Sequence, residues 1–344
     1  MRKGILLVNL GTPDSQAVGD VRKYLAEFLM DKRVIDIHPF LRFLLVRGLI
    51  IPFRAPKSAR LYRGIWNDRT GSPLLHFSNL QLQLLKLELG DDYVIELGMR
   101  YQYPSIELAL HKLKSAGVQS IVVIPLFPQY ASATTGSVIA EVMRVMRRWP
   151  TILPLAVRGA FYDHPLFIDA FTEKIQRYNR GSYDHILFSF HGLPERQLRA
   201  CDPSGTYCLA QKNCCAVLTE INRNCYAAQC HETARLIAAE LKLTRADYCV
   251  CFQSRLGKQE WIKPHTSTTI RQLAASGKRR LLVVCPAFVS DCLETLQEIA
   301  VEYRQEFIAA GGEELLLVES LNESPLFIRA LQEMATGIAV HPLV

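Results

Sequence analysis

The chain has 344 residues, of which 49% are hydrophobic, and this exceeds the length of a usual single core, so we expect two domains of about 150 residues each. The net charge of +7 arises from 40 basic and 33 acidic residues scattered along the chain, which argues against nucleic acid as a partner and leaves an anionic small ligand or an anionic membrane surface open. The first residues form neither a signal peptide nor a spanning helix, so the sequence predicts a cytoplasmic protein.

The first half of the chain alternates between strand and helix patterns. We expect strands over residues 4–10, 94–99, 121–126 and 153–157, and helices over residues 18–29, 76–89, 106–115, 137–148 and 165–178. This alternation is typical of βαβ units built around a parallel sheet. The polar loop 132–137 can hold an anion on free N–H groups or simply cap the helix that follows it, and the sequence leaves both open.

One segment of the first half breaks this alternation. Residues 34–53 are strongly apolar, but charged residues such as Arg42 and Arg47 interrupt them too often for the segment to span a bilayer. Two interpretations are open: a core helix buried in the first domain, or a lip that contacts the surface of a membrane.

The second half repeats the pattern of the first. We expect strands over residues 186–190, 246–252, 280–285 and 315–319, and helices over residues 226–241, 267–276, 291–310 and 325–335. The stretch from Ile5 to Pro13 aligns without a gap with the stretch from Ile186 to Pro194, since both read Ile-Leu, four residues, Gly, one residue, Pro. These matches predict two βαβ domains of similar fold that face each other across a cleft.

The first candidate for chemistry is a histidine in this matched stretch. Residues 186–190 suit a strand buried on both faces of a parallel sheet, and the sequence from His191 to Pro194 cannot continue that strand. His191 therefore lies at the carboxyl end of a strand, where open α/β sheets bind ligands. A histidine there can move protons or hold a metal, and an ordinary loop histidine is the alternative.

A second candidate is the helix that begins near Asp291. Asp291, Glu294 and Glu298 are spaced three and four residues apart and share one face of this helix, which follows a strand that we expect beside the strand of His191. A solvated helix face, or a capping box of Asp291 and Glu294, is the structural alternative. A histidine facing carboxylates across a cleft suits proton abstraction combined with capture of a divalent cation.

The cysteines form a third pattern. Six of the ten cysteines lie between Cys201 and Cys230. Disulfides are disfavoured in the cytoplasm that we expect for this chain, so the clustering indicates a metal or metal-cluster site.

The motifs around His191 and Glu294 also carry a family resemblance. The blocks Phe188–Glu195 and Cys285–Leu296, together with Leu7–Pro13 and Gly98–Tyr101 in the first half, resemble ferrochelatase, the enzyme that inserts ferrous iron into a porphyrin in haem synthesis. The resemblance extends over nearly the whole chain. It implies an α/β protein with two similar Rossmann-like domains, each a parallel sheet flanked by helices, that face each other across a porphyrin-binding cleft. The expected domains are 1–165 and 166–320, with a helix over 324–340 that packs back on the first.

The resemblance implies roles for individual acidic and basic groups. His191 matches the family's active-site histidine, which takes pyrrole protons or contacts the iron, and Glu294 resembles its acidic partner across the porphyrin. Asp291 and Glu298 match positions on an acidic face that passes metal or protons.

The resemblance also implies a set of porphyrin-binding residues. The cations Arg54 and Lys57 match positions that meet the propionates. Leu10 and Phe288 would pack on the macrocycle, and the neighbouring Arg100 and Tyr101 match residues of the cleft wall. A flat apolar ring with carboxylate tails needs such an apolar slot rimmed by cations.

One segment departs from the family's pattern. After Cys201-Asp202-Pro203 the chain has about twenty extra residues before Tyr226, within an insert that spans 201–225. Some ferrochelatases carry a [2Fe–2S] cluster, and the resemblance implies one here, although four thiolates in a short loop also suit tetrahedral zinc. The ligands that we expect are Cys208, Cys214, Cys215 and Cys225, with Cys201 in reserve because it replaces a usual glycine.

The resemblance therefore implies a ferrochelatase that inserts Fe²⁺ into a porphyrin, protoporphyrin IX in the first place, and releases two protons. It binds porphyrin and ferrous iron, no nucleic acid is expected, and contact of segment 34–53 with the inner face of the membrane is one of the two interpretations of that segment. A chelatase that uses another metal or coproporphyrin is one alternative. A non-catalytic tetrapyrrole-binding or redox-sensing protein is another, although such a protein needs neither His191 nor Glu294. The sequence does not determine the oligomeric state.

Overall fold

The computed structural model describes residues 2–178, 180–255, 257 and 259–338. These residues divide into two compact units. Unit 1 comprises residues up to 127, residues 131–160 and residues from 327 onward, and unit 2 comprises residues 128–130 and 161–326. The last two residues of the expected C-terminal helix, 339 and 340, lie outside the described residues.

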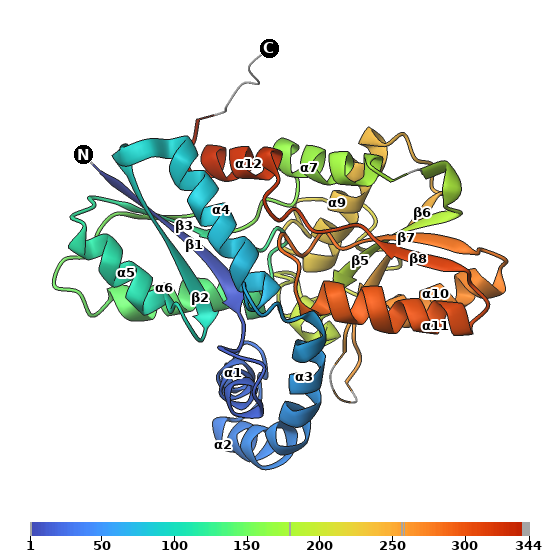
Figure 1. Cartoon of the computed structure of the whole chain (residues 1–344), viewed down its shortest axis with the longest axis horizontal. Helices are drawn as coiled ribbons and strands as arrows, with labels where there is room; N and C mark the ends of the chain where they lie inside the picture. Colours follow the sequence, from blue (N-terminus) through green and yellow to red (C-terminus); the bar gives the residue numbers. More distant parts are fainter. Residues whose placement is uncertain (1, 179, 256, 258, 339–344) are drawn as a thin grey trace. The chain divides into compact units, whose positions relative to one another are not determined.

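Unit 1 is built on a parallel four-stranded sheet in the order β2-β1-β3-β4 (Figure 1). Its strands are β1 (Lys3–Gly11), β2 (Tyr93–Tyr101), β3 (Ile121–Pro125) and β4 (Leu155–Val157). The uncharged run of β1 is buried on both faces, as expected for a central strand. β1 can end beside β2 because residue 11 is a glycine: its φ is +112°, and a Cβ there would collide with the Tyr101 carbonyl.

Helices cover both faces of this sheet. α5 (Ile106–Ser115) and α6 (Ser137–Met146) pack on Leu6, Val8 and Val123, whereas α4 (Pro73–Leu89) lies on the opposite face, where Ser78 accepts a hydrogen bond from Asn9 at 3.0 Å. The remaining α-helices of unit 1 are α1 (Val18–Met30), α2 (Pro39–Phe43), α3 (Ile51–Ile65) and α12 (Pro325–Thr336). The expected loop 132–137 is a π-helical turn, η3 (Ser132–Gly136), in which the amides of Thr134 and Gly136 bond the Ala131 carbonyl, so these amides are not free to hold an anion.

Unit 2 repeats this topology. Its parallel sheet has the order β6-β5-β7-β8, with strands β5 (His185–His191), β6 (Tyr248–Gln253), β7 (Arg280–Val284) and β8 (Glu314–Leu317). Each sheet thus places its first strand between its second and third strands, which confirms the expectation of two similar folds. β7 pairs directly with β5, as expected.

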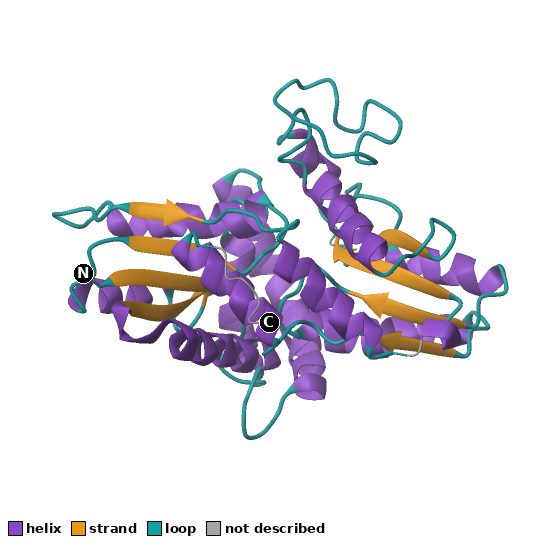
Figure 2. Ribbon diagram, turned by 90° about the horizontal axis from the view of Figure 1, so that it is seen from above, coloured by secondary structure: helices purple, strands orange, loops and turns teal. Residues whose placement is uncertain are grey.

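Helices also cover the sheet of unit 2, and Figure 2 shows the strands of each unit as a layer with helices beside it. α10 (Thr266–Ala275) and α11 (Arg304–Ala309) pack on a core that includes Leu187, Val283 and Phe307. The other α-helices are α7 (Pro165–Gln176), α8 (Glu195–Arg199) and α9 (Tyr226–Glu240). The helix expected over 291–310 starts as a π-helix, η5 (Glu294–Tyr303), and continues as α11. The predicted α/β class, with two parallel sheets flanked by helices, is confirmed.

The apolar segment 34–53 forms α2, a π-helix η1 (Leu44–Ile50) and the start of α3. These helices lie with α1 beyond the carboxyl ends of β1 and β2 (Figure 1). The interpretation as a buried core helix is wrong, because six large apolar side chains of the segment are more than half exposed. They are Phe40, Leu41, Phe43, Leu44, Leu49 and Phe53. No helix in the described part of the chain is long and apolar enough to cross a membrane.

Candidate active site and cysteine cluster

His191 is the last residue of β5 and lies at the carboxyl edge of the sheet of unit 2, as predicted. Its imidazole is half-buried, and its ring centre lies 6.4 Å from the rings of both Trp261 and Phe288. Nδ1 lies 2.6 Å from the carbonyl oxygen of Gly192. A carbonyl only accepts hydrogen bonds, so Nδ1 carries the proton and Nε2 of the neutral ring is left with a lone pair. His191 can therefore accept a proton or bind a metal through Nε2.

The main chain around His191 is held from two sides. The Tyr226 hydroxyl donates to the His191 carbonyl at 2.8 Å, and the Gly192 amide donates to the Gln253 carbonyl at 2.7 Å. A Cβ on residue 192 would lie 3.0 Å from the carbonyl oxygens of Gln253 and Ser254. Glycine after His191 thus allows the turn to pack closely on the end of β6.

Glu294 is the first residue of η5 and is half-buried. Its main-chain carbonyl accepts a hydrogen bond from Gln253 Nε2 at 2.9 Å. Its carboxylate is in contact with the Cys292 thiol, and burial together with the Glu294 charge raises the pKa of that thiol well above its usual range. Cys292 is therefore a neutral donor to Glu294.

Glu298 lies four residues further along η5, and its carboxylate is surrounded by donors. It accepts from the Ser254 amide at 3.0 Å and hydroxyl at 2.5 Å, from the Tyr303 hydroxyl at 2.9 Å and from Gln253 Nε2 at 3.3 Å. Burial and the Glu298 charge raise the pKa of the Tyr303 hydroxyl, so it stays a donor. These contacts fasten Glu298 to the end of β6.

Asp291 precedes η5 and is only 4% exposed. Its carboxylate accepts from Thr295 Oγ1 at 2.9 Å, from Asn322 Nδ2 at 2.8 Å and from the Ser320 amide at 3.3 Å. These bonds tie the start of the helix to the segment after β8. Among the described contacts none joins Asp291 to Glu294 or Glu298, and the capping box of Asp291 and Glu294 is not formed.

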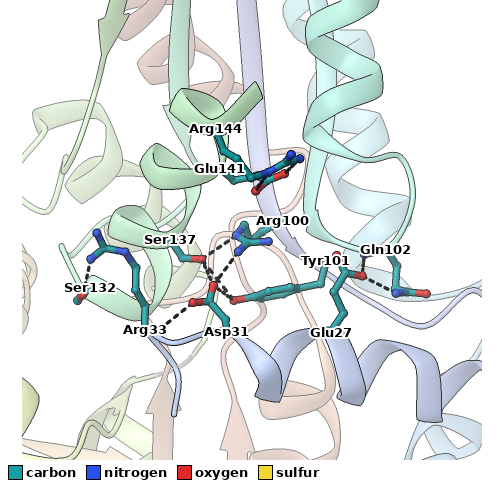
Figure 3. Close-up of polar contacts among 10 residues, drawn as sticks. All are labelled: Glu27, Asp31, Arg33, Arg100, Tyr101, Gln102, Ser132, Ser137, Glu141 and Arg144. Carbon is teal, nitrogen blue, oxygen red and sulfur yellow. Dashed lines mark hydrogen bonds and ion pairs between the residues drawn. The ribbon is translucent and has the colours of Figure 1, made fainter. Parts of the chain in front are cut away.

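In unit 1, Arg100 and Tyr101 end β2 and share one acidic partner (Figure 3). Arg100 Nη2 and the Tyr101 hydroxyl lie 2.7 Å and 3.0 Å from Asp31 Oδ2, and Arg100 Nε donates to Ser137 Oγ at 2.7 Å. Ser137 donates to the same carboxylate oxygen. Tyr101 is fully buried, and burial followed by the Asp31 charge raises the pKa of its hydroxyl above the usual range. We interpret Tyr101 as a residue that positions Asp31 and Arg100, because it has no exposed surface for a porphyrin.

The remaining porphyrin-binding candidates have fewer contacts. Leu10 lies one residue before the end of β1 and is half-buried. Arg54 is half-buried and Lys57 is exposed, and both lie on α3. Phe288 follows β7 and is half-buried beside His191.

The structure gathers the five candidate cysteines of the insert around one small cavity. Cys201, Cys208, Cys214, Cys215 and Cys225 all line it. The sulfurs of Cys214 and Cys215 are 3.5 Å apart, and the Cys225 sulfur is in contact with the thiols of Cys215 and Cys208. No helix or strand is formed between α8 and α9, where this insert lies.

The charge at this cavity centres on Cys225, which immediately precedes α9. The Cys215 thiol, the amides of Ala227 and Ala228, and the Cys208 thiol lower the pKa of Cys225 to about 6, although neither amide forms a regular helix cap with it. The contact with Cys225 and burial raise the pKa of Cys215, and burial with the neighbouring thiolates raises that of Cys208 to about 12. Cys225 therefore ionises before Cys208 and Cys215.

Two polar side chains order the insert around these thiols. The Asp202 carboxylate accepts from the amides of Tyr207 and Cys208 at 2.9 Å and 2.8 Å. Buried Asn222 donates to the carbonyls of Cys214 and Val217, both at 2.8 Å. The loop is thus shaped by its own hydrogen bonds.

The positions of the thiols can be compared with the ligand geometry that a metal ion or an iron–sulfur cluster requires. In the described residues no three or more His, Cys, Asp or Glu side chains are placed to hold one metal ion. Tetrahedral zinc requires four ligands about one point, whereas a [2Fe–2S] cluster takes its thiolates as two pairs on two irons. The thiols of Cys214, Cys215, Cys225 and Cys208 contact one another in that order, so they supply the four thiolates that either group requires.

Comparisons with known proteins agree with the resemblance in the sequence. Residues 2–337 match the family model described as Ferrochelatase. The chain is 44% identical to a protein named ferrochelatase from Coxiella burnetii (strain Dugway 5J108-111), over 96% of this chain and 92% of the relative. It is 43% identical to the ferrochelatase of Legionella pneumophila (strain Lens), over 97% of this chain and 98% of the relative.

A solved structure supports the fold. SirB from Bacillus subtilis, described with Fe3+, superimposes with a TM-score of 0.53 at 14% identity and covers 98% of this chain and 97% of its own. On the family match and the two bacterial relatives, this chain belongs to the ferrochelatase family.

Proposed function

We propose that this protein is a ferrochelatase that inserts Fe²⁺ into protoporphyrin IX, forming haem and releasing two protons. The observation that carries the proposal is His191 at the carboxyl edge of β5, with Nδ1 held by the Gly192 carbonyl and Nε2 left as a base. Metal insertion requires both pyrrole N–H protons to leave the macrocycle, so a base at this position is what the reaction needs.

Two residues carry the chemistry in this proposal. His191 Nε2 takes a pyrrole proton or contacts the incoming iron, and Glu294 provides the carboxylate partner. Among the described residues, the Glu294 side chain is left with a single neutral thiol donor, that of Cys292. Because so few donors occupy this carboxylate, its oxygens are available to a proton or a metal ion.

The contacts of Asp291 and Glu298 favour a supporting role over the metal or proton path implied by the family resemblance. Each carboxylate is occupied by at least three hydrogen-bond donors that are not charged. We propose that they hold the main chain around Glu294 in place.

We propose that the porphyrin contacts the apolar surface of Phe288 and Leu10, and that its propionates meet cations. Arg54 and Lys57 suit this task, since neither has a carboxylate partner among the described contacts, whereas the charge of Arg100 is largely neutralised by Asp31. Arg100 would then act through a fixed position and not as a mobile cation.

For the insert, we propose that Cys208, Cys214, Cys215 and Cys225 hold a [2Fe–2S] cluster, with Cys201 beside them as a fifth thiol. When bound, such a cluster supplies one-electron redox chemistry and cross-links the loop. The chain's own contribution is the lowered pKa of Cys225 and the hydrogen bonds of Asp202 and Asn222 that pre-form the loop.

We further propose a cytoplasmic protein that contacts the inner face of the membrane through segment 34–53. The segment has six exposed apolar side chains and the exposed cation Arg47, and Arg60 is exposed further along α3, a composition that suits an anionic membrane surface. Arg42, by contrast, is buried and donates to the Ile35 carbonyl at 3.1 Å, so it holds the segment together.

The proposal is tested by assaying purified protein under anaerobic conditions for haem formation from Fe²⁺ and protoporphyrin IX. Parallel assays with Co²⁺ and with coproporphyrin separate this activity from that of a related chelatase. Porphyrin binding without metallation by any of these ions would favour a non-catalytic tetrapyrrole-binding protein.

A further inference from the structure

We propose that Gln253 is a positioning residue that fixes Glu294 relative to the strand end that carries His191. The inference rests on the proposed function, because it assigns Gln253 an effect that acts through Glu294. Gln253 is the last residue of β6 and its side chain is fully buried.

Gln253 joins two parts of the candidate active site that are distant in sequence. In the sheet it is paired in register with His191, and its carbonyl accepts the Gly192 amide at 2.7 Å. Its side-chain Nε2 donates to the Glu294 carbonyl at 2.9 Å. One residue thus contacts the turn after His191 with its main chain and the start of η5 with its side chain.

The side-chain amide of Gln253 has all its hydrogen-bonding positions occupied, which fixes its orientation. Oε1 accepts from Ser189 Oγ at 2.9 Å and from the Cys285 thiol at 3.6 Å, and Nε2 donates to Glu294 and also to Glu298 Oε2 at 3.3 Å. A buried amide with two donors and two acceptor sites in use cannot flip without losing several bonds.

Gln253 and Ser254 also hold the first turn of the helix that carries Glu294. η5 is a π-helix, a form that is uncommon and is frequent at functional sites. Gln253 binds its first carbonyl, and the Gln253–Ser254 pair binds the carboxylate of Glu298 four residues later. The non-glycine Ser254 has a φ of +58°, a left-handed conformation that presents both its amide and its hydroxyl to Glu298. The two ends of the first π-helical turn are therefore fastened to β6.

We infer from these contacts that Gln253 fixes the main-chain position from which the Glu294 side chain projects. Displacements of about 1 Å in a catalytic group lower rates by up to about 100-fold. A change at Gln253 should therefore reduce turnover while leaving porphyrin binding intact, because Gln253 has no exposed surface for a ligand.

The test compares Gln253→Met, Glu294→Gln and the double variant in the full-length protein, measuring kcat for Fe²⁺ insertion and the Kd of protoporphyrin by fluorescence quenching. We expect Gln253→Met to lower kcat about 10-fold or more with Kd changed less than about 2-fold, and the double variant to be no slower than Glu294→Gln alone. Gln253→Asn keeps an amide group that cannot reach Glu294, so it should behave like Gln253→Met. It takes the place of the methionine variant in the test if that variant does not fold.

A matched control is Gln129→Met. Gln129 is a buried glutamine of the same unit that donates to Thr233 Oγ1 at 3.0 Å. This variant should lose stability without losing kcat. Wild-type kcat in both Gln253 variants, or losses that multiply in the double variant, would overturn the positioning role. Full activity of Glu294→Gln would instead overturn the proposed role of Glu294, and with it the inference.

Discussion

Arg100 and Asp31 form a buried ion pair, with Arg100 Nη2 2.7 Å from Asp31 Oδ2 and side chains that are 15% and 7% exposed. Burial alone would disfavour the Asp31 charge, but the Ser137 hydroxyl, the Arg33 amide, the Arg100 charge and the Tyr101 hydroxyl together hold the pKa of Asp31 below its usual value of 3.8. The pair links the end of α1 to the end of β2, and so anchors the exposed helices α2 and α3 beside the sheet of unit 1.

Replacing Asp31 by Asn should destabilise the protein at pH 7 by about 3 kcal/mol, because it leaves the Arg100 charge buried without a partner. The folded-state pKa of Asp31 is lowered, so its contribution is fully present above the unfolded pKa near 3.8 and is lost as the pH falls through the lower folded value. The difference in thermal midpoint between the wild type and Asp31→Asn should therefore shrink below about pH 4. Asp20→Asn, which breaks the exposed pair with Lys23, is the control and should change little. An equal difference at pH 7 and pH 3 would contradict the role of the ion pair.

The elements around both sites could be predicted from the sequence because buried strands and amphipathic helices have periodic patterns. The apolar run from Ile186 stops at the His-Gly turn, which predicts a strand end at His191, and β5 ends there. The partner of Arg100 could not be predicted, because Asp31 is 69 residues away and only the fold brings the two together.

Other features of the structure could not be predicted from the sequence either. The sequence predicts Asp291, Glu294 and Glu298 on one helix face, but not that Glu298 accepts from the end of β6 and Asp291 from the segment after β8. The π-helical form of η5 has no sequence signature comparable to a cap or a proline. For segment 34–53, periodicity did not distinguish a buried helix from an exposed one, since its apolar residues occupy most positions.

The four proposed ligands of the cysteine cluster should each be necessary for a coloured protein. We expect anaerobically purified protein to be reddish-brown with acid-labile sulfide, and Cys208→Ser, Cys214→Ser, Cys215→Ser and Cys225→Ser each to lose the visible absorbance. Cys201 lines the same cavity and Cys230 is fully buried, and we expect Cys201→Ser and Cys230→Ser to keep the colour. If the wild-type protein is colourless, contains one zinc per chain and lacks acid-labile sulfide, the cysteines bind zinc and not a cluster.

Glu294→Gln keeps the shape of the side chain and removes its charge and basicity. Turnover should fall by about 100-fold or more, which is the usual scale for a general acid or base, while the Kd of protoporphyrin changes little. Glu298→Gln is the informative comparison, because Glu298 is held by several donors and should affect turnover less. A severe loss in Glu298→Gln with normal turnover in Glu294→Gln would exchange the roles of the two carboxylates.

The exposed surface of segment 34–53 should bind anionic vesicles. A Phe40→Ser, Leu44→Ser, Phe53→Ser triple variant removes three side chains that are 63%, 51% and 75% exposed, and should lower co-sedimentation with anionic phospholipid vesicles by about 10-fold or more. The control is Met143→Ser with Ile152→Ser, which removes exposed apolar side chains elsewhere in unit 1 and should leave binding unchanged. Equal binding by the triple variant and the wild type would rule out this surface as the membrane contact.

The central claim is that His191 Nε2 is the base of the metal-insertion reaction. The direct test is the initial rate of haem formation by His191→Ala, measured anaerobically with Fe²⁺ and protoporphyrin IX beside the wild type and His111→Ala, an exposed histidine on α5. We expect His191→Ala to bind protoporphyrin with nearly the wild-type Kd and to insert iron at least about 100-fold more slowly, while His111→Ala remains active. A His191→Ala protein that folds, binds porphyrin and keeps a substantial fraction of the wild-type rate would contradict this claim.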